Sequence, residues 1–332
     1  MSYRLRRGRR ATALLASALT VSVLSATAGC GMFSTTQQAA APQLERPTLR
    51  VGVMKVVDIA PLRMSLNDVF KNAGLDLQLV EEPSEDEALN QLENGAVELV
   101  WASHVSMFRA ADKGQKLQVE GEAYQAAANT MALVAMPGSR YDDAGAKDKP
   151  KIAVNSDRDL GALTTKSVLG VAKVNPNNIT FVPTASSDMI NSLKAGTVDA
   201  AWMVEPYITQ AQKQVGARIV TDAARGATQN FPMSGYAASK KFADANPKTL
   251  AAFRSALQEA QQRAGNSPLL VQDALPTYAG VDSSDAALVS IGTFPLSLNP
   301  IRLQRVADLM NNLGFLNNRL DVQQLLPPGV GN

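Results

Sequence analysis

The two side chains that most often perform covalent, proton-transfer and metal chemistry occur once each, as Cys30 and His104. Catalysis needs an activated nucleophile or a tuned acid–base pair, and no serine stands in a nucleophile-elbow context. One histidine excludes a multi-histidine metal site, and one cysteine excludes a disulfide framework or a thiolate zinc site. The sequence therefore predicts no catalytic residue, no metal and no cofactor.

The residues that could instead hold a small molecule follow short apolar segments typical of strands. In open α/β sheets, ligands bind beyond the carboxyl ends of the strands, where backbone N–H groups and loop side chains converge. We expect the ligand-binding residues to be Met54, Asp58, Ser103, His104, Asn129, Ser156, Asp157, Trp202 and Glu205.

Several of these residues also have a purely structural interpretation. Asp157 or Ser156 could cap the helix that follows them. Trp101 and Trp202 could be core residues at the ends of buried strands rather than stacking platforms for a ligand. Glu205 could begin a helix, with the following proline in the first turn and the acid near the positive end of the helix dipole.

The chain contains an internal duplication. The segment 92–101 (LENGAVELVW) recurs as 193–202 (LKAGTVDAAW), at an offset of 101 residues, and at the same offset 50–54 (RVGVM) lies over 151–155 (KIAVN). In both copies of the longer segment a helix should stop at the glycine, because glycine takes the left-handed conformation that ends helices. A short apolar strand ending in tryptophan follows in each copy.

The two copies predict an α/β protein with two lobes. Alternating strands and helices indicate parallel sheets covered on both faces, and a chain of this length usually divides into two cores. We expect residues 48–136 and 232–332 to form lobe one and residues 137–231 to form lobe two. The chain would then cross between the lobes near residues 136 and 232.

The N-terminus has the composition of an export signal. Five arginines among the first ten residues precede an uncharged stretch over 11–24, as in a secretory signal peptide. Residues 27–30 (TAGC) then resemble a bacterial lipobox, which implies a signal peptide over 1–29 and lipid on Cys30. Residues 31–47 are small, polar and without period, and they predict a flexible linker. A transmembrane anchor is the alternative, and either the Sec or the twin-arginine route could export the chain.

Charge excludes one class of partner. Without residues 1–29 the chain has 303 residues, and its 32 basic and 30 acidic residues become 27 and 30, because the leader contains five arginines and no acid. There is no basic patch with interleaved aromatic residues, so nucleic acid is not an expected partner. The acidic run over 81–87 precedes a helix, and we expect a solvated helix start that the helix dipole favours.

Three segments together resemble a known family: 193–206 (LKAGTVDAAWMVEP), 74–77 (GLDL) and 307–315 (ADLMNNLGF). The chain is similar, over about residues 48–327, to substrate-binding proteins of the nitrate, sulfonate, taurine and thiamine-precursor importers. The resemblance implies a two-lobed type II periplasmic-binding-protein fold, in which each lobe is a mostly parallel sheet flanked by helices and the ligand lies in the cleft between the lobes. It also implies an ATP-binding-cassette importer as partner, with a membrane permease and a cytoplasmic ATPase.

On this resemblance the chain is expected to be an extracytoplasmic solute-binding lipoprotein. It would be a monomer, not an enzyme, held at the outer face of the cell membrane by lipid on Cys30. Residues 155–159 (NSDRD) stand where the family has a small, glycine- or serine-rich loop. Asp157, Asp159 and Glu205 would place negative charge on one wall of the cleft, which favours a neutral or amine-bearing ligand, such as a thiamine-type pyrimidine, over nitrate or sulfonate.

Two other classes of protein are compatible with parts of this pattern. An enzyme of the same fold could act on a pyrimidine or thiamine-like compound. The effector half of a transcription regulator would need a helix-turn-helix, which the sequence lacks, and would have no use for an export signal.

The duplication gives the sharpest expectation about the site. His104 and Glu205 are also 101 residues apart, each three residues beyond a duplicated tryptophan. Matching strand ends should face each other across the cleft. We therefore expect His104 to contact the ligand from lobe one and Glu205 to contact it from lobe two. The alternative is an ordinary histidine at a strand end, with its hydrogen bonds satisfied, and a helix-start acid.

Overall fold

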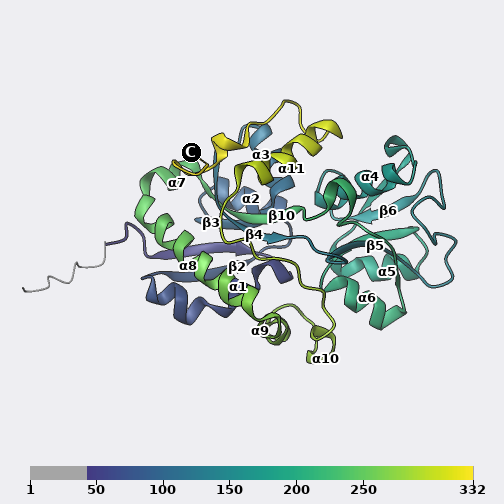
Figure 1. The fold of residues 1–332 in the computed structure, drawn as a ribbon, viewed down its shortest axis with the longest axis horizontal. Coiled ribbons are helices and arrows are strands. Elements are labelled where there is room, and N and C mark those ends of the chain that lie inside the picture. The colour runs from purple at the N-terminus through teal and green to yellow at the C-terminus, as the bar shows by residue number, and fades with distance from the viewer. Residues whose placement is uncertain (1–42, 332) are drawn as a thin grey trace, which may run out of the picture. The chain divides into compact units, whose positions relative to one another are not determined.

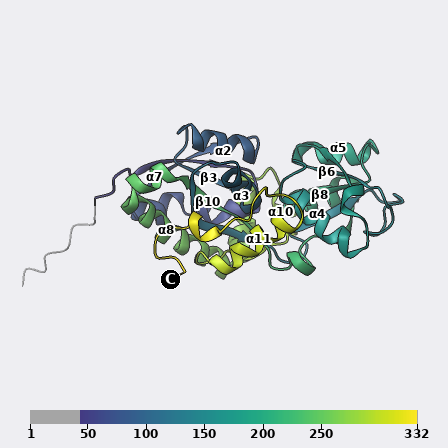
Figure 2. The same ribbon diagram turned by 90° about the horizontal axis from the view of Figure 1, so that it is seen from above.

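The computed structural model describes residues 43–331. The expected signal peptide, Cys30 and most of the expected linker lie outside these residues. The described part contains two five-stranded sheets, each flanked by helices (Figure 1), and the same elements are seen from above in Figure 2. Each sheet is the centre of one lobe.

The first sheet has the strand order β2-β1-β3-β10-β4. Strand β1 runs parallel to β2 and β3, whereas β10 runs antiparallel to both β3 and β4. Every residue of β3 is buried, as expected for a strand covered on both faces. The strands are β1 (Thr48–Val53), β2 (Asp76–Glu81), β3 (Leu99–Ser103), β4 (Leu117–Gln125) and β10 (Pro232–Ser239).

Helices from both ends of the described chain cover this sheet (Figure 1). They are α1 (Ala60–Met64), α2 (Glu85–Glu93), α3 (His104–Asp112), α7 (Lys240–Ala245), α8 (Pro247–Asn266) and α11 (Pro300–Asn312). Two shorter helices lie further from the sheet: α9 (Pro268–Ala274) packs against α1 and α8, and α10 (Ser283–Ala286) packs against α9. Within residues 43–331, no helix is both long enough and apolar enough to cross a bilayer.

The second sheet repeats the plan of the first, with the order β7-β6-β8-β5-β9. Its fourth strand, β5, is again the antiparallel one. The strands are β5 (Met131–Ala135), β6 (Lys151–Val154), β7 (Thr180–Pro183), β8 (Ala200–Val204) and β9 (Arg218–Asp222), and the helices are α4 (Leu160–Val171), α5 (Met189–Lys194) and α6 (Tyr207–Val215).

The duplicated segments form the same unit in both lobes. Helix α2 and strand β3 correspond to α5 and β8. The glycine between helix and strand has a positive φ in each copy, +73° at Gly95 and +65° at Gly196, a conformation that costs glycine little. The expected fold class, two lobes that each contain a mostly parallel sheet flanked by helices, is confirmed.

One expected boundary between the lobes is wrong. Strand β5 lies before residue 136, in the stretch expected to belong to lobe one, yet it pairs with β8 and β9 in the second sheet. All five residues of β5 are buried, so this apolar run fits the interior of a sheet and not a hinge. The first crossing therefore lies between the end of β4 at Gln125 and Met131. The second lies before β10, which begins at Pro232.

The expected linker also ends earlier than residue 47. Leu44 packs against the hydrophobic core, and the Glu45 carboxylate accepts hydrogen bonds from the backbone N–H groups of Lys248 and Thr249, at 3.1 and 2.8 Å, at the start of α8. Desolvation opposes ionisation there, but these hydrogen bonds outweigh it and lower the pKa of Glu45 to about 2. Residues 44–47 thus belong to lobe one.

Candidate ligand-binding site

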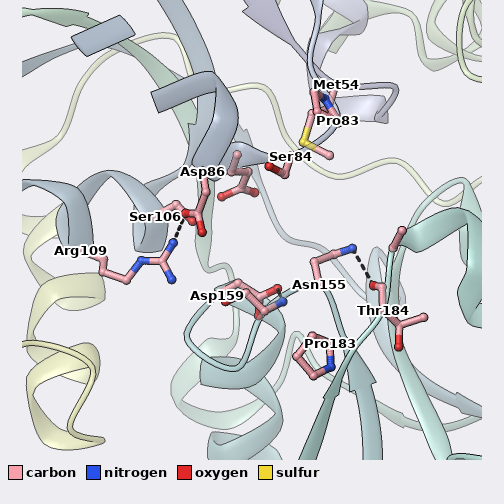
Figure 3. Close-up of a pocket in the computed structure, with 13 residues that line it drawn as sticks. Met54, Pro83, Ser84, Asp86, Ser106, Arg109, Asn155, Asp159, Pro183 and Thr184 are labelled. Atoms are coloured by element: carbon pink, nitrogen blue, oxygen red, sulfur yellow. Dashed lines mark hydrogen bonds and ion pairs between the residues drawn. The ribbon is translucent and has the colours of Figure 1, made fainter. Parts of the chain in front are cut away.

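A pocket lies where loops from both sheets meet. Its volume is about 350 Å³, within the usual range for small-molecule sites. In Figure 3, Met54 and Ser84 lie opposite Asn155 and Thr184 across the pocket. This outer pocket is lined by Met54, Pro83, Ser84, Glu85, Asp86, Ser106, Arg109, Asn155, Ser156, Asp159, Pro183, Thr184 and Ala185.

A narrower inner pocket, of about 50 Å³, continues from the outer one. The two pockets share four lining residues, Met54, Glu85, Asn155 and Asp159. The inner pocket is lined by Met54, Val56, Asp58, Glu85, Trp101, Ser103, Asn155, Asp159, Leu160, Ser186, Trp202, Val204, Met233 and Ser234.

The lining of the two pockets repeats the duplication of the chain. Each of the following pairs has the offset of 101 residues, with one member in each lobe: Met54 and Asn155, Asp58 and Asp159, Pro83 and Thr184, Ser84 and Ala185, Glu85 and Ser186, Trp101 and Trp202, Ser103 and Val204. Equivalent loops of the two lobes therefore face one space. They follow the carboxyl ends of equivalent strands, which is where open α/β sheets bind ligands.

Two tryptophans line the inner pocket, one from each lobe. Trp101 is 5% exposed and Trp202 is 4% exposed, and neither indole Nε1 has a hydrogen-bond partner within residues 43–331. Helix α4 makes room for Trp202 with Gly161, because a Cβ there would lie 2.7 Å from Trp202 Cε3. The indoles are thus packed into the protein and still border the pocket.

Asp58 reaches the inner pocket from the loop after β1. Its carboxyl is 4% exposed and accepts a hydrogen bond from the Ser234 hydroxyl on β10. Burial raises the pKa of Asp58 to about 7, although the Ser234 hydrogen bond lowers it, and the nearby Glu85 carboxylate raises it further.

Asp159 occupies the matching place in lobe two and caps α4. Its Oδ1 accepts a hydrogen bond from Ala162 N and its Oδ2 accepts one from Ser156 N, both at 2.8 Å. Burial again raises the pKa to about 7 against these hydrogen bonds. Glu85 raises the pKa of Asp159 further, and Arg109 lowers it.

Glu85 and Arg109 complete the charged lining. Glu85 begins α2 and accepts a hydrogen bond of 2.6 Å from the Ser103 hydroxyl. Arg109 on α3 pairs with Asp86, as the dashed line in Figure 3 shows. The inner pocket therefore collects three carboxyl groups, from Asp58, Glu85 and Asp159, while the arginine beside them is already paired.

Five of the nine expected ligand-binding residues line these pockets. Ser156 lies in the outer pocket, Asp58, Ser103 and Trp202 lie in the inner pocket, and Met54 lies in both. The expected core role of the tryptophans and their expected ligand role are compatible here, because the buried indoles also border the cavity.

His104 does not line either pocket. It is fully buried, and its Nδ1 lies 3.2 Å from the Pro232 carbonyl oxygen. His104 is the first residue of α3, and its side chain lies against β10 and not toward the pocket that Ser103 lines. Burial lowers the pKa of His104 to about 4, which keeps the imidazole neutral. A Cβ on Gly235 would lie 2.8 Å from its Nε2, so the packing is tight.

Glu205 also lies outside both pockets. It is 4% exposed, and its carboxylate accepts hydrogen bonds from Thr209 N at 3.1 Å, Thr209 Oγ1 at 3.0 Å and Ser290 N at 3.1 Å. Burial raises its pKa, and these hydrogen bonds oppose that. The geometry fits the alternative interpretation, in which Glu205 stabilises the start of α6, and it adds a contact to the C-terminal segment.

The last two expected residues are exposed. Asn129 has a positive φ of 61° in the turn between β4 and β5, a conformation that asparagine tolerates better than most residues. Asp157 is exposed and lines neither pocket. The cap of α4 is Asp159, not Asp157 or Ser156, because the helix begins only at Leu160.

Sequence reasoning missed several pocket residues. Glu85 was expected to be a solvated residue of an acidic helix start, but it borders both pockets. The duplication could have indicated Glu85, since the offset of 101 residues pairs Glu85 with Ser186, just as it pairs Asp58 with Asp159. Arg109 follows no strand, and nothing in the duplication indicates it.

No group of three or more His, Cys, Asp or Glu side chains suited to a metal ion occurs within residues 43–331. The three inner-pocket carboxyls therefore do not form a metal site. They form an acidic lining beside two indoles.

Comparisons with known proteins agree with this architecture. The fold is that of two-lobed binding proteins, including a ligand-binding component of an ABC-type import system from Staphylococcus aureus, solved with zinc bound. That structure has a TM-score of 0.74 and 12% identity and covers 85% of this chain and 97% of that one. The alkanesulfonate-binding protein SsuA from Xanthomonas axonopodis pv. citri, bound to MOPS, has a TM-score of 0.73 and 16% identity, covering 86% and 99%.

The periplasmic nitrate-binding protein NrtA from Synechocystis PCC 6803 is also similar, with a TM-score of 0.71 and 15% identity, covering 85% of this chain and 86% of that one. The model of the NMT1-like family matches residues 42–269, and the chain belongs to this family. No protein with a curated description matches the sequence.

Proposed function

We propose that this protein is an extracytoplasmic solute-binding protein that captures a small molecule between its two lobes and delivers it to an ATP-binding-cassette importer. The observation that carries the proposal is the continuous pocket in which equivalent loops of both lobes meet. The similar solved structures support it, because they are described as an alkanesulfonate-binding protein, a nitrate-binding protein and a ligand-binding component of an import system.

The proposal includes membrane attachment through lipid on Cys30. The TAGC segment after an uncharged stretch supports this attachment. Replacing Cys30 with serine should release the protein from the membrane fraction and leave its ligand binding unchanged. Retention of the Cys30→Ser protein in washed membranes would argue against the lipid anchor.

The binding role is tested by a thermal-shift screen of a broad library of metabolites. The protein is produced from the full-length chain. A ligand at 100 times its Kd should add about 2.7 kcal/mol to the free energy of unfolding. Ala185→Trp is the diagnostic variant, because the small, exposed side chain of Ala185 lines the outer pocket and its replacement removes no hydrogen bond. The added indole should fill the pocket and abolish the shift.

Ala251→Trp is the matched control, since Ala251 is exposed on α8 and lines neither pocket. It should respond to the ligand as the unmodified protein does. Stabilisation that survives Ala185→Trp would place binding elsewhere, and a library without any stabilising compound would contradict a solute-binding role.

A further inference from the structure

The inner pocket has a charge imbalance that indicates what kind of solute it takes. Asp58, Glu85 and Asp159 line it, and none of its lining residues is basic. Arg109, the basic residue that lines the outer pocket, is paired with Asp86. An anionic ligand would meet three carboxyl groups here, and each carboxyl that is ionised would repel it.

A second observation is independent of the acids. The Nε1–H groups of Trp101 and Trp202 are buried and have no acceptor within residues 43–331. A buried donor without a partner is unfavourable. An ammonium nitrogen cannot accept these hydrogen bonds, so the two donors call for an acceptor atom elsewhere on the ligand, such as a hydroxyl oxygen. Both indoles border the same small cavity. The face of an indole also attracts a cation.

From this lining we propose that the inner pocket binds the positively charged nitrogen of a small organic cation, an amine or quaternary ammonium group, between Asp58, Glu85 and Asp159 and beside the two tryptophans. This inference rests on the proposed solute-binding function and adds the class of ligand. The inner pocket, at about 50 Å³, has room for the charged head alone, and the outer pocket, at about 350 Å³, receives the rest of the molecule.

Protons on the two aspartates offset part of the charge imbalance of the inner pocket. Burial raises the pKa of both Asp58 and Asp159 to about 7. The groups that act on Asp58 are Ser234 on β10 and Glu85 on α2. Those that act on Asp159 are its two backbone donors, Glu85, and Arg109 on α3. A bound cation would replace these protons, so its affinity should fall as the pH drops below 7, by up to tenfold per pH unit for each proton displaced.

Matched pairs of probes test the charge directly. Choline is compared with its uncharged isostere 3,3-dimethylbutan-1-ol, and tyramine with its uncharged isostere 4-propylphenol. Nitrate and ethanesulfonate serve as anions. The protein is produced from the full-length chain, and thermal shift and titration calorimetry are run at pH 7.5 and at pH 5.5. We expect at least one cation to stabilise the protein, its neutral partner to bind at least tenfold more weakly, and the cation's affinity to fall at pH 5.5.

Three results would overturn the inference: no stabilisation by either cation, equal binding of a cation and its neutral isostere, or stabilisation by the anions. None of these results alone overturns the solute-binding function. That function fails only when the broad library contains no compound whose effect Ala185→Trp removes. The two proposals can therefore fail separately.

Discussion

Asp58 and Asp159 occupy equivalent places in the two lobes, and the protein uses them differently. Both carboxyls are buried at the inner pocket, 101 residues apart. Asp159 accepts hydrogen bonds from two backbone N–H groups of its own loop and helix, whereas the side-chain partner of Asp58 is a single hydroxyl, that of Ser234. Asp159 is tied to the local backbone, and Asp58 has more capacity left for a ligand.

The difference follows from the backbone that comes after each residue. In lobe two, the twelve-residue helix α4 begins directly after Asp159, and its first N–H groups need acceptors. In lobe one, Asp58 lies inside a three-residue 3₁₀ turn over Val57–Ile59, followed by the five-residue α1. A duplicated position thus keeps its location at the pocket, and the neighbouring backbone decides its chemistry.

The largest expected effect is on stability as a function of pH. Asp58 and Asp159 have pKa values of about 7 in the folded protein against an ordinary value of 3.8. The folded state holds protons that the unfolded chain has lost, so this contribution to stability is complete below pH 4 and is lost as the pH rises through 7. Asp58→Asn should therefore be more stable than the unmodified protein at pH 8, by on the order of a few kcal/mol, in urea unfolding.

Asp159→Asn should gain less at pH 8 than Asp58→Asn. An amide presents one acceptor oxygen, and Asp159 serves two backbone donors with two oxygens. If the two variants gain the same stability at pH 8, the proposed difference between Asp58 and Asp159 is wrong, because the two carboxyls would then have the same role.

The next effect is on affinity. With whichever cation probe stabilises the protein, Asp58→Asn should weaken binding about 10- to 150-fold, because losing a hydrogen bond to a charged group costs about 1.5–3 kcal/mol. Asp159→Asn should cost less, since part of its carboxylate is engaged by the backbone. Asp157→Asn, exposed and outside both pockets, is the control. A larger loss for Asp159→Asn than for Asp58→Asn in calorimetry would reverse the assignment.

A third comparison concerns neighbouring residues of the two repeats. Ser103 and Val204 line the inner pocket, whereas His104 and Glu205 do not. Glu205→Ala should lower the free energy of unfolding by about 1–3 kcal/mol, because it leaves buried donors of Thr209 and Ser290 without an acceptor. It should leave ligand affinity unchanged. If Glu205→Ala is as stable as the unmodified protein but binds ligand more weakly, Glu205 belongs to the ligand site after all.

The two-lobe fold could be predicted from the sequence because the internal duplication is still recognisable as a repeat with an offset of 101 residues. The helix–glycine–strand unit at 92–101 and 193–202 fixes one element of each sheet, and apolar runs indicate most of the others. The prediction placed β5 in lobe one, which is wrong, because a buried apolar strand has no period that distinguishes one sheet from another. The pairing of β5 with β8 and β9 is a long-range contact that local pattern does not encode.

The sequence predicted which loops form the site, but not which side chains of those loops face the pocket. The offset of 101 leads to the correct strand ends, but one residue further along, at His104 and Glu205, the side chains turn into the lobes. Which neighbour faces a cavity depends on where the strand ends and the helix begins, and such boundaries are uncertain by a few residues in sequence reasoning. The same offset applied to Asp58 and Glu85 gives pocket residues.

The smallest expected effect separates the observed cap of α4 from the expected one. Asp159→Ala removes the acceptor for Ala162 N and Ser156 N, and loss of an N-cap costs about 1 kcal/mol. The measurement belongs below pH 4, where Asp159 holds its proton in both the folded and the unfolded chain, so that the cost of protonating or burying the carboxylate does not obscure the cap. Asp157→Ala is the matched control, since this neighbour is exposed, and should change urea unfolding by less than about 0.5 kcal/mol. Equal losses for the two variants would mean that the cap is shared along the loop and that Asp159 is no more tied to its backbone than Asp58.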